Sequence, residues 1–105
     1  MYKRQEFPQF PAALSFIMIL APEEARGVLE SRAAGLHAQL TSFERALAGA
    51  DGPLPPRVTL LETEYLRAVA AAELNWVCGI IDELRSGALT WSEEELMAAA
   101  KSFLG

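Results

Sequence analysis

The residues best suited to bind a small molecule lie in one stretch of the chain, between residues 61 and 86. Trp76 stands out, because a tryptophan ring can stack on a planar ligand. Tyr65, Val69 and Ile80 lie one or more helical turns away from it, at spacings that place them near one face of a helix. Two interpretations stay open. These residues form one face of an aromatic-ligand pocket, or Trp76 is a core or interface tryptophan that contributes its large apolar area.

The two other residues with reactive side chains have simpler interpretations. Cys78 is the only cysteine, and no cation near it in sequence would lower its pKa, so we expect a small buried hydrophobic residue. In a symmetric dimer it could instead meet its own copy. His37 is the only histidine, and we expect it at the surface, with a pH-sensing contact as the alternative. A lone histidine does not predict a metal site.

Carboxylates recur along the same stretch, at Glu62, Glu64, Glu73 and Glu83. Paired carboxylates perform acid–base chemistry only around a cleft, and nothing in the sequence predicts one. We therefore expect solvated carboxylates and ion pairs such as Glu64 with Arg67. The sequence also has no glycine-rich phosphate loop and no Ser/His/Asp or Cys/His set. We predict no catalytic residues, no enzyme activity, no cofactor and no metal.

Composition bounds the class of protein. The chain has 105 residues, 51% of them hydrophobic, and a formal net charge of −5, which suits one globular domain. Without Lys3 and Arg4, seven positive residues oppose fourteen acidic ones, which gives −7. Such an acidic body would repel a phosphate backbone, so we expect no direct nucleic-acid binding. No signal peptide is apparent, and the longest apolar stretch is too short to span a bilayer. We expect a soluble cytoplasmic protein without membrane contact.

Hydrophobic periodicity predicts an all-α fold of about four helices, with no strand. The first, Pro11 to Leu20, is apolar around most of its circumference. The second runs from Pro22 to about Ala50, where glycines and a proline end it. It carries an apolar seam with the spacing of packed helices. The seam consists of Leu29, Leu36, Leu40, Phe43 and Leu47.

The third predicted helix is the longest and runs from Pro56 to about Ser86. It has two apolar stripes: one contains Val58, Leu61, Tyr65, Val69, Ala72 and Trp76, and the other contains Leu74, Val77, Ile81 and Leu84. One stripe can pack on the chain's own helices, and the other requires a second partner. The fourth helix runs from Ser92 to about Leu104. Its start is predicted by a capping box, Ser92 with Glu95, and by a hydrophobic staple between Trp91 and Leu96.

The order of these segments resembles the C-terminal domain of PadR-family transcriptional regulators. The opening EFPQFPAALSFIMIL is followed by APEEARGVLESRAAGLHAQL, in which Pro-Glu-Glu, Leu29, Arg32 and Leu36 match the register of that family's second helix. A GPLPP loop then leads to LLETEYLRAVAAAELNWVCGIIDELRSG, where Glu64 and the run from Glu73 to Trp76 match the family's long last helix. The similarity covers residues 6 to 90. Two departures from the family's pattern are expected: this sequence contains no winged helix before the domain, and the last helix extends beyond the family's core.

The resemblance implies a single dimerisation and effector-sensing domain over residues 1–105, with residues 91–105 as an additional C-terminal helix. A separate winged-helix domain would bind DNA, and an aromatic effector would bind near the dimer interface, with Trp76 stacking on it. The expected area of exposed apolar surface also favours a homodimer, because the apolar first helix and the two stripes would expose more of it than one monomer usually shows. We expect the dimer interface to contain Leu66, Leu74, Val77, Ile81 and Leu84. The alternative is a free-standing helical interaction protein that pairs with a full-length regulator and binds no ligand.

Overall fold

The computed structural model describes residues 14–104, with side chains described as far as residue 102, and this part of the chain contains helices and no strand. The all-α prediction is therefore confirmed for the described residues. The elements in chain order are the 3₁₀ helix η2 (Ile17–Ile19), α2 (Pro22–Leu47), the 3₁₀ helix η3 (Arg57–Leu60), α3 (Leu61–Ser86) and α4 (Glu93–Leu104).

The predicted first helix does not continue as an α-helix through its described part. Residues 11–13 of it lie outside the described residues, Leu14 is helical, and residues 15 and 16 form a turn that leads into η2. Its side chains are also more exposed than expected, since Phe16, Met18 and Ile19 are each more than half exposed. A segment that is apolar all round holds a regular helix only when several sides are covered, and here only Leu14 and Ile17 pack against the core.

The ends of α2 follow from local chemistry. Pro22 occupies the first turn, where its missing N–H is not needed. The Glu24 carboxylate reaches back to accept a hydrogen bond from the Ala21 N–H at 3.0 Å. At the other end Gly49 adopts a left-handed conformation, with φ 78°. The N–H of Ala50 then donates to the Arg45 carbonyl oxygen, which closes a Schellman turn and ends the helix.

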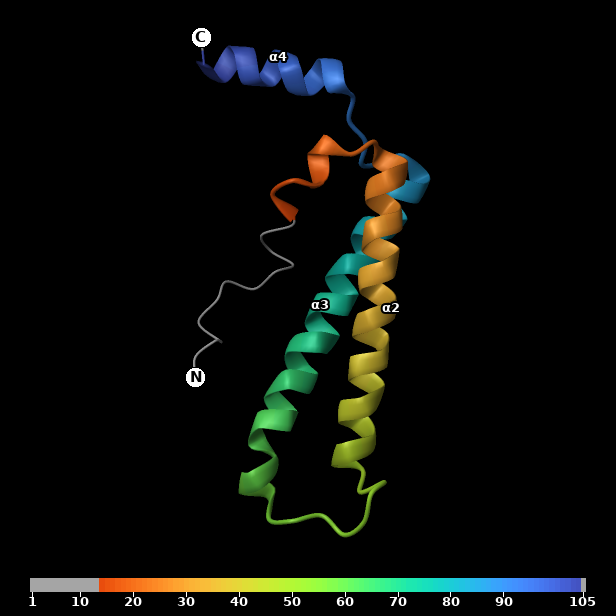
Figure 1. The fold of residues 1–105 in the computed structure, drawn as a ribbon, viewed down its shortest axis with the longest axis vertical. Coiled ribbons are helices and arrows are strands. Elements are labelled where there is room, and N and C mark those ends of the chain that lie inside the picture. The colour runs from red at the N-terminus through yellow and green to blue at the C-terminus, as the bar shows by residue number, and fades with distance from the viewer. Residues whose placement is uncertain (1–13, 105) are drawn as a thin grey trace.

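The two 26-residue helices α2 and α3 pack side by side as an antiparallel hairpin (Figure 1). Three ion pairs join them: Arg85 with Glu30, Arg32 with Glu73, and Arg67 with Glu44. Early residues of one helix thus pair with late residues of the other. The nine-residue stretch 48–56, followed by η3, connects the two helices at the far end of the hairpin.

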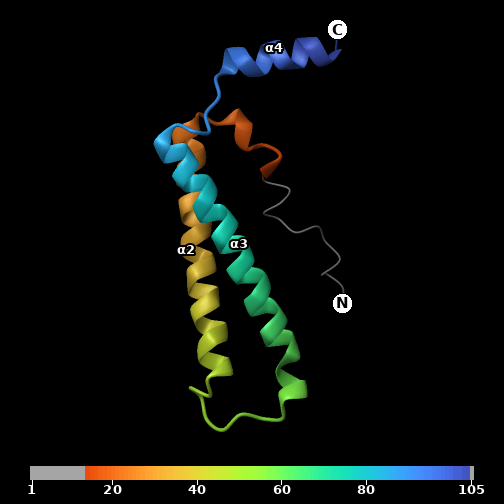
Figure 2. The same cartoon turned by 180° about the vertical axis from the view of Figure 1, so that it is seen from behind.

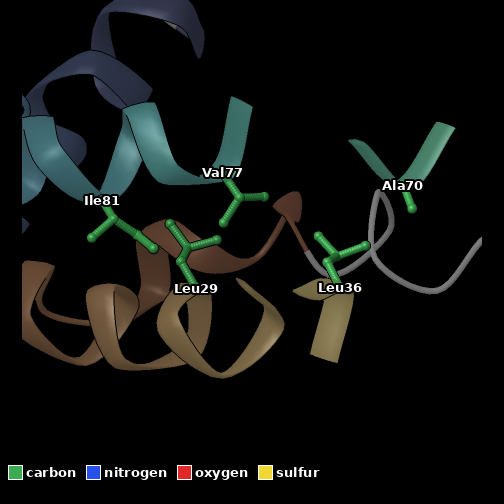
Figure 3. Packing of buried hydrophobic residues seen from close by; sticks show 5 residues of the cluster. All are labelled: Leu29, Leu36, Ala70, Val77 and Ile81. Atoms are coloured by element: carbon green, nitrogen blue, oxygen red, sulfur yellow. The ribbon is translucent and has the colours of Figure 1, made fainter. Parts of the chain in front are cut away.

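The core is a single apolar layer between α2 and α3. Its buried cluster contains Leu29 and Leu36 from α2, which point toward Ala70, Val77 and Ile81 from α3 (Figure 3). Partly buried side chains surround this cluster, namely Leu14, Ile17, Ala33, Leu40, Phe43, Leu74, Ile80 and Leu84. No polar side chain is buried among the described residues. The packing confirms the predicted seam of the second helix at Leu29, Leu36, Leu40 and Phe43, whereas Leu47 does not belong to this cluster.

Helix α4 lies across the end of the hairpin at which α2 begins and α3 ends (Figures 1 and 2). It begins as predicted: the Glu95 N–H donates to Ser92 Oγ at 3.1 Å, and the Ser92 N–H donates to Glu95 Oε1 at 3.0 Å. The half-buried Trp91 anchors the connection, because its indole Nε1–H donates to the Leu20 carbonyl oxygen at 2.9 Å. Over residues 14–104, no helix has both the length and the apolarity needed to cross a membrane.

Candidate functional site

The two apolar stripes of α3 have different surroundings. Val77 is 0% exposed and Ile81 is 5% exposed, because α2 covers them. Trp76 precedes Val77 by one residue and is 49% exposed. One residue turns a helix by about 100°, so these neighbours lie on different faces.

The uncovered stripe is the best candidate for a functional surface, and we call it the exposed stripe. It consists of Leu61, Tyr65, Val69 and Trp76, which are 48%, 67%, 43% and 49% exposed. Their spacings of four, four and seven residues place them along one side of α3. Val58 in η3 is 70% exposed and continues the apolar surface toward the loop. The result is an apolar strip about four turns long that no described residue covers.

The residues predicted to bind a ligand are only partly brought together. Tyr65, Val69 and Trp76 share the exposed stripe, whereas Ile80 is partly buried and packs against the core cluster. Ile80 therefore lies between the exposed stripe and the core. In a single chain, Tyr65, Val69 and Trp76 form a convex helix surface that a planar molecule could contact from one side.

The residues predicted to form a dimer interface divide into two groups. Val77 and Ile81 belong to the core between α2 and α3, so their surfaces are not available to a second copy, and Leu74 and Leu84 also pack against that core. Leu66 alone among them is exposed, at 39%. The prediction that Val77 and Ile81 belong to a dimer interface was wrong. A sequence with two apolar stripes on one helix does not show which stripe the neighbouring helix covers.

One interhelical contact involves two of the residues that carry the family resemblance. The Arg32 guanidinium donates from Nε to Glu73 Oε2 at 2.8 Å, and its Nη2 lies 2.7 Å from the same oxygen. The contact is partly buried and joins the middle of α2 to the middle of α3. It therefore contributes to the register of the two helices.

A second charged contact joins η3 to α3 near the loop. Arg57 donates from Nε and Nη2 to the two carboxylate oxygens of Glu64, at 2.9 and 2.8 Å. This fork geometry lowers the pKa of Glu64, chiefly through the hydrogen bond from Arg57, and raises the pKa of Arg57. The predicted pair of Glu64 with Arg67 was wrong, since Arg67 reaches Glu44 on α2 instead. The turn at η3 brings Arg57 within reach of Glu64 seven residues later, which helical spacing alone does not indicate.

The remaining reactive residues form no site in the described part of the chain. Cys78 is exposed, so the prediction of a buried thiol was wrong: it lies about 100° from Val77, off the covered seam. His37 is exposed on α2, as expected. No group of three His, Cys, Asp or Glu side chains within the described residues could hold a metal ion.

Sequence reasoning missed a hollow of about 540 Å³ between the start of α2 and α4, which we call the α4 hollow. Its lining is Met18, Ile19, Leu20, Ala21, Pro22, Trp91, Ser92, Glu93, Leu96 and Met97. The predicted staple residues Trp91 and Leu96 both contribute to it. The staple was the only available signal, because the chain segments that line this hollow are about 70 residues apart.

Comparisons with protein-family models, with curated proteins and with solved structures found no match to this chain. The function must therefore be argued from the geometry and from the resemblance in sequence pattern.

Proposed function

We propose that this chain is the dimerisation and effector-sensing domain of a PadR-like transcriptional regulator, and that it pairs with a second copy through the exposed stripe of α3. The observation that carries the proposal is the stripe itself. Tyr65, Val69 and Trp76 expose between 43% and 67% of their surface along one side of a long helix.

The balance of apolar surface supports this association. Six hydrophobic residues are buried among those described, whereas twelve large hydrophobic side chains are exposed. Five of these twelve belong to the exposed stripe and its extension in η3, namely Val58, Leu61, Tyr65, Val69 and Trp76. Exposed apolar side chains that gather on one side of a helix are typical of an interaction site. Two-fold homodimers are the commonest assembly, and tryptophan and tyrosine are the residues that most often anchor interfaces.

Effector sensing follows from the position of Trp76 at this proposed interface. An aromatic molecule held between Trp76 and the second copy would change the angle between the two hairpins. It would alter DNA binding by an attached winged-helix domain only if it bound one angle better than the other. The acidic composition and the net charge of −5 leave DNA contact to that separate domain.

The test is the mass of the protein in solution. Size-exclusion chromatography with light scattering at micromolar concentration should give twice the chain mass of 11.4 kDa. Val69→Glu should give the monomer mass, because it places a charge in the middle of the exposed stripe. The matched control is Ala71→Glu, which adds the same charge at an exposed position about 200° around the helix, and it should remain dimeric.

Circular dichroism should show equal helix content in both variants, which separates loss of pairing from loss of folding. A wild-type protein that is monomeric at these concentrations would remove the proposal. So would a Val69→Glu protein that stays dimeric while Ala71→Glu dissociates, because the interface would then lie on the other face of α3.

A further inference from the structure

The α4 hollow is chemically different from the exposed stripe and shares no residue with it. It is formed by η2, the first residues of α2, and the segment from Trp91 to Met97. Its volume of about 540 Å³ lies within the range of small-molecule sites, roughly 300 to 1,000 Å³. Most of the lining is apolar.

We propose that the α4 hollow binds a lipophilic organic cation, a molecule with an apolar or aromatic body and a positive centre. Three features of the lining favour this class. Among the described residues, Glu93 is the only charged one that lines the hollow, and none of the described Lys, Arg or His residues lines it. The indole of Trp91 offers a face that attracts cations. The thioethers of Met18 and Met97 are polarisable and adapt to ligands of different shape.

The hollow has fixed and adaptable parts. Trp91 is held by its hydrogen bond to the Leu20 carbonyl oxygen, so its orientation is set before a ligand arrives. Met97, by contrast, is 64% exposed and free to fold over a bound molecule. Glu93 forms no ion pair with any described residue and lies in the first turn of α4. A negative charge beside an apolar surface selects against neutral and anionic ligands of equal size.

The test uses two ions of nearly equal size and opposite charge, tetraphenylphosphonium and tetraphenylborate. The protein carries Trp76→Phe, so that Trp91 is the only one of the two tryptophans left to report binding by fluorescence. Tetraphenylphosphonium should quench Trp91 saturably, with a dissociation constant at least tenfold lower than that of tetraphenylborate. Isothermal titration calorimetry should give the same ratio.

Two variants connect the preference to the hollow. Glu93→Gln should weaken phosphonium binding by about threefold, as expected for an exposed charge pair. Met97→Lys should weaken it further and improve borate binding, because it places a cation in the lining. Ala99→Lys is the matched control, since it adds the same charge to α4 at an exposed position that does not line the hollow, and it should change the affinity by less than about twofold.

Equal affinity for the two ions, or the absence of saturable quenching, would overturn the proposal. So would an Ala99→Lys effect as large as that of Met97→Lys, because the response would then be to net charge alone. Dimerisation is measured separately by mass. A negative result in the binding experiments therefore does not affect the proposed function, and a monomeric mass does not affect the proposed site in the α4 hollow.

Discussion

Two adjacent residues on α3 differ sharply in burial, and we therefore expect them to have different roles. Val77 is sealed by α2, while Trp76 has half of its surface in solvent. Truncation of Val77 would therefore act on folding, whereas truncation of Trp76 should act mainly on whatever contacts the stripe. The contact between Arg32 and Glu73 also joins α3 to α2 and contributes to the register of the two helices.

Trp76→Ala should weaken binding of a planar aromatic ligand more than it disturbs folding. A neutral coumarin dye, measured by isothermal titration calorimetry, should bind about tenfold more weakly, since an aromatic pair contributes up to about 1.5 kcal/mol. The free energy of unfolding should fall by about 1 kcal/mol or less, because the side chain is half exposed. Unchanged dye affinity in the folded variant would contradict a role for Trp76 in ligand binding.

The pairing of Arg57 with Glu64 predicts a pH effect of definite sign. The hydrogen bond from Arg57 lowers the pKa of Glu64 in the folded protein, so the stabilisation is complete above the ordinary glutamate pKa of about 4.3. It is lost as the pH falls from there through the lowered value. In Arg57→Ala, a carbon-13 NMR titration should show the pKa of Glu64 returning upward. The same titration in Arg67→Ala should leave it low, and an upward shift there instead would assign the pair differently.

At the scale of the helices, sequence patterns predicted the hairpin well and the first segment poorly. The two ends of α2, the end of α3 and the start of α4 were marked by Pro22, Gly49, Gly87 and the Ser92 capping box, which act locally. The start of α3 was predicted too early, at Pro56, because residues 57–60 form η3 and α3 begins at Leu61. The 3–4 spacing of leucines likewise identified the α2 seam. Local signals could not show which α3 stripe α2 covers, nor that residues 17–19 form a 3₁₀ turn, because both depend on packing between distant segments. The α4 hollow was missed for the same reason.

Leu36→Ala should test how much the hairpin depends on its single core layer. Leu36 is 1% exposed and lies in the buried cluster, and truncation of such a leucine costs about 2–5 kcal/mol. Urea denaturation followed by circular dichroism should show this loss. Val58→Ala, at a 70% exposed position, should change the free energy of unfolding by about 0.5 kcal/mol or less. Equal effects at the two positions would mean that the α2–α3 seam is not the stabilising contact.

The molecule as a whole is an elongated rod rather than a compact globule. Its extents are 60 × 33 × 15 Å and its radius of gyration is 18.4 Å, whereas a compact domain of about 100 residues has a radius near 13 Å. A body only 15 Å thick has room for one layer of core between two helices. No described residue covers the remaining apolar side chains on the exposed stripe of α3, which is the reason we propose a second copy as their partner.

The burial of α3 also decreases along the rod, and this has a consequence for motion. Val77 and Ile81 are sealed near one end, Ala70 is the last buried residue toward the loop, and Leu66 is already 39% exposed although it lies on the same face as Val77. Amide hydrogens around Leu61 to Leu66 should therefore exchange with deuterium earlier than those around Val77 to Ile81. Mass spectrometry of peptides from α3 would reveal this gradient, and uniform protection would contradict it. The two helices of the hairpin would then separate first at the loop, while their other end, next to α4, stays packed.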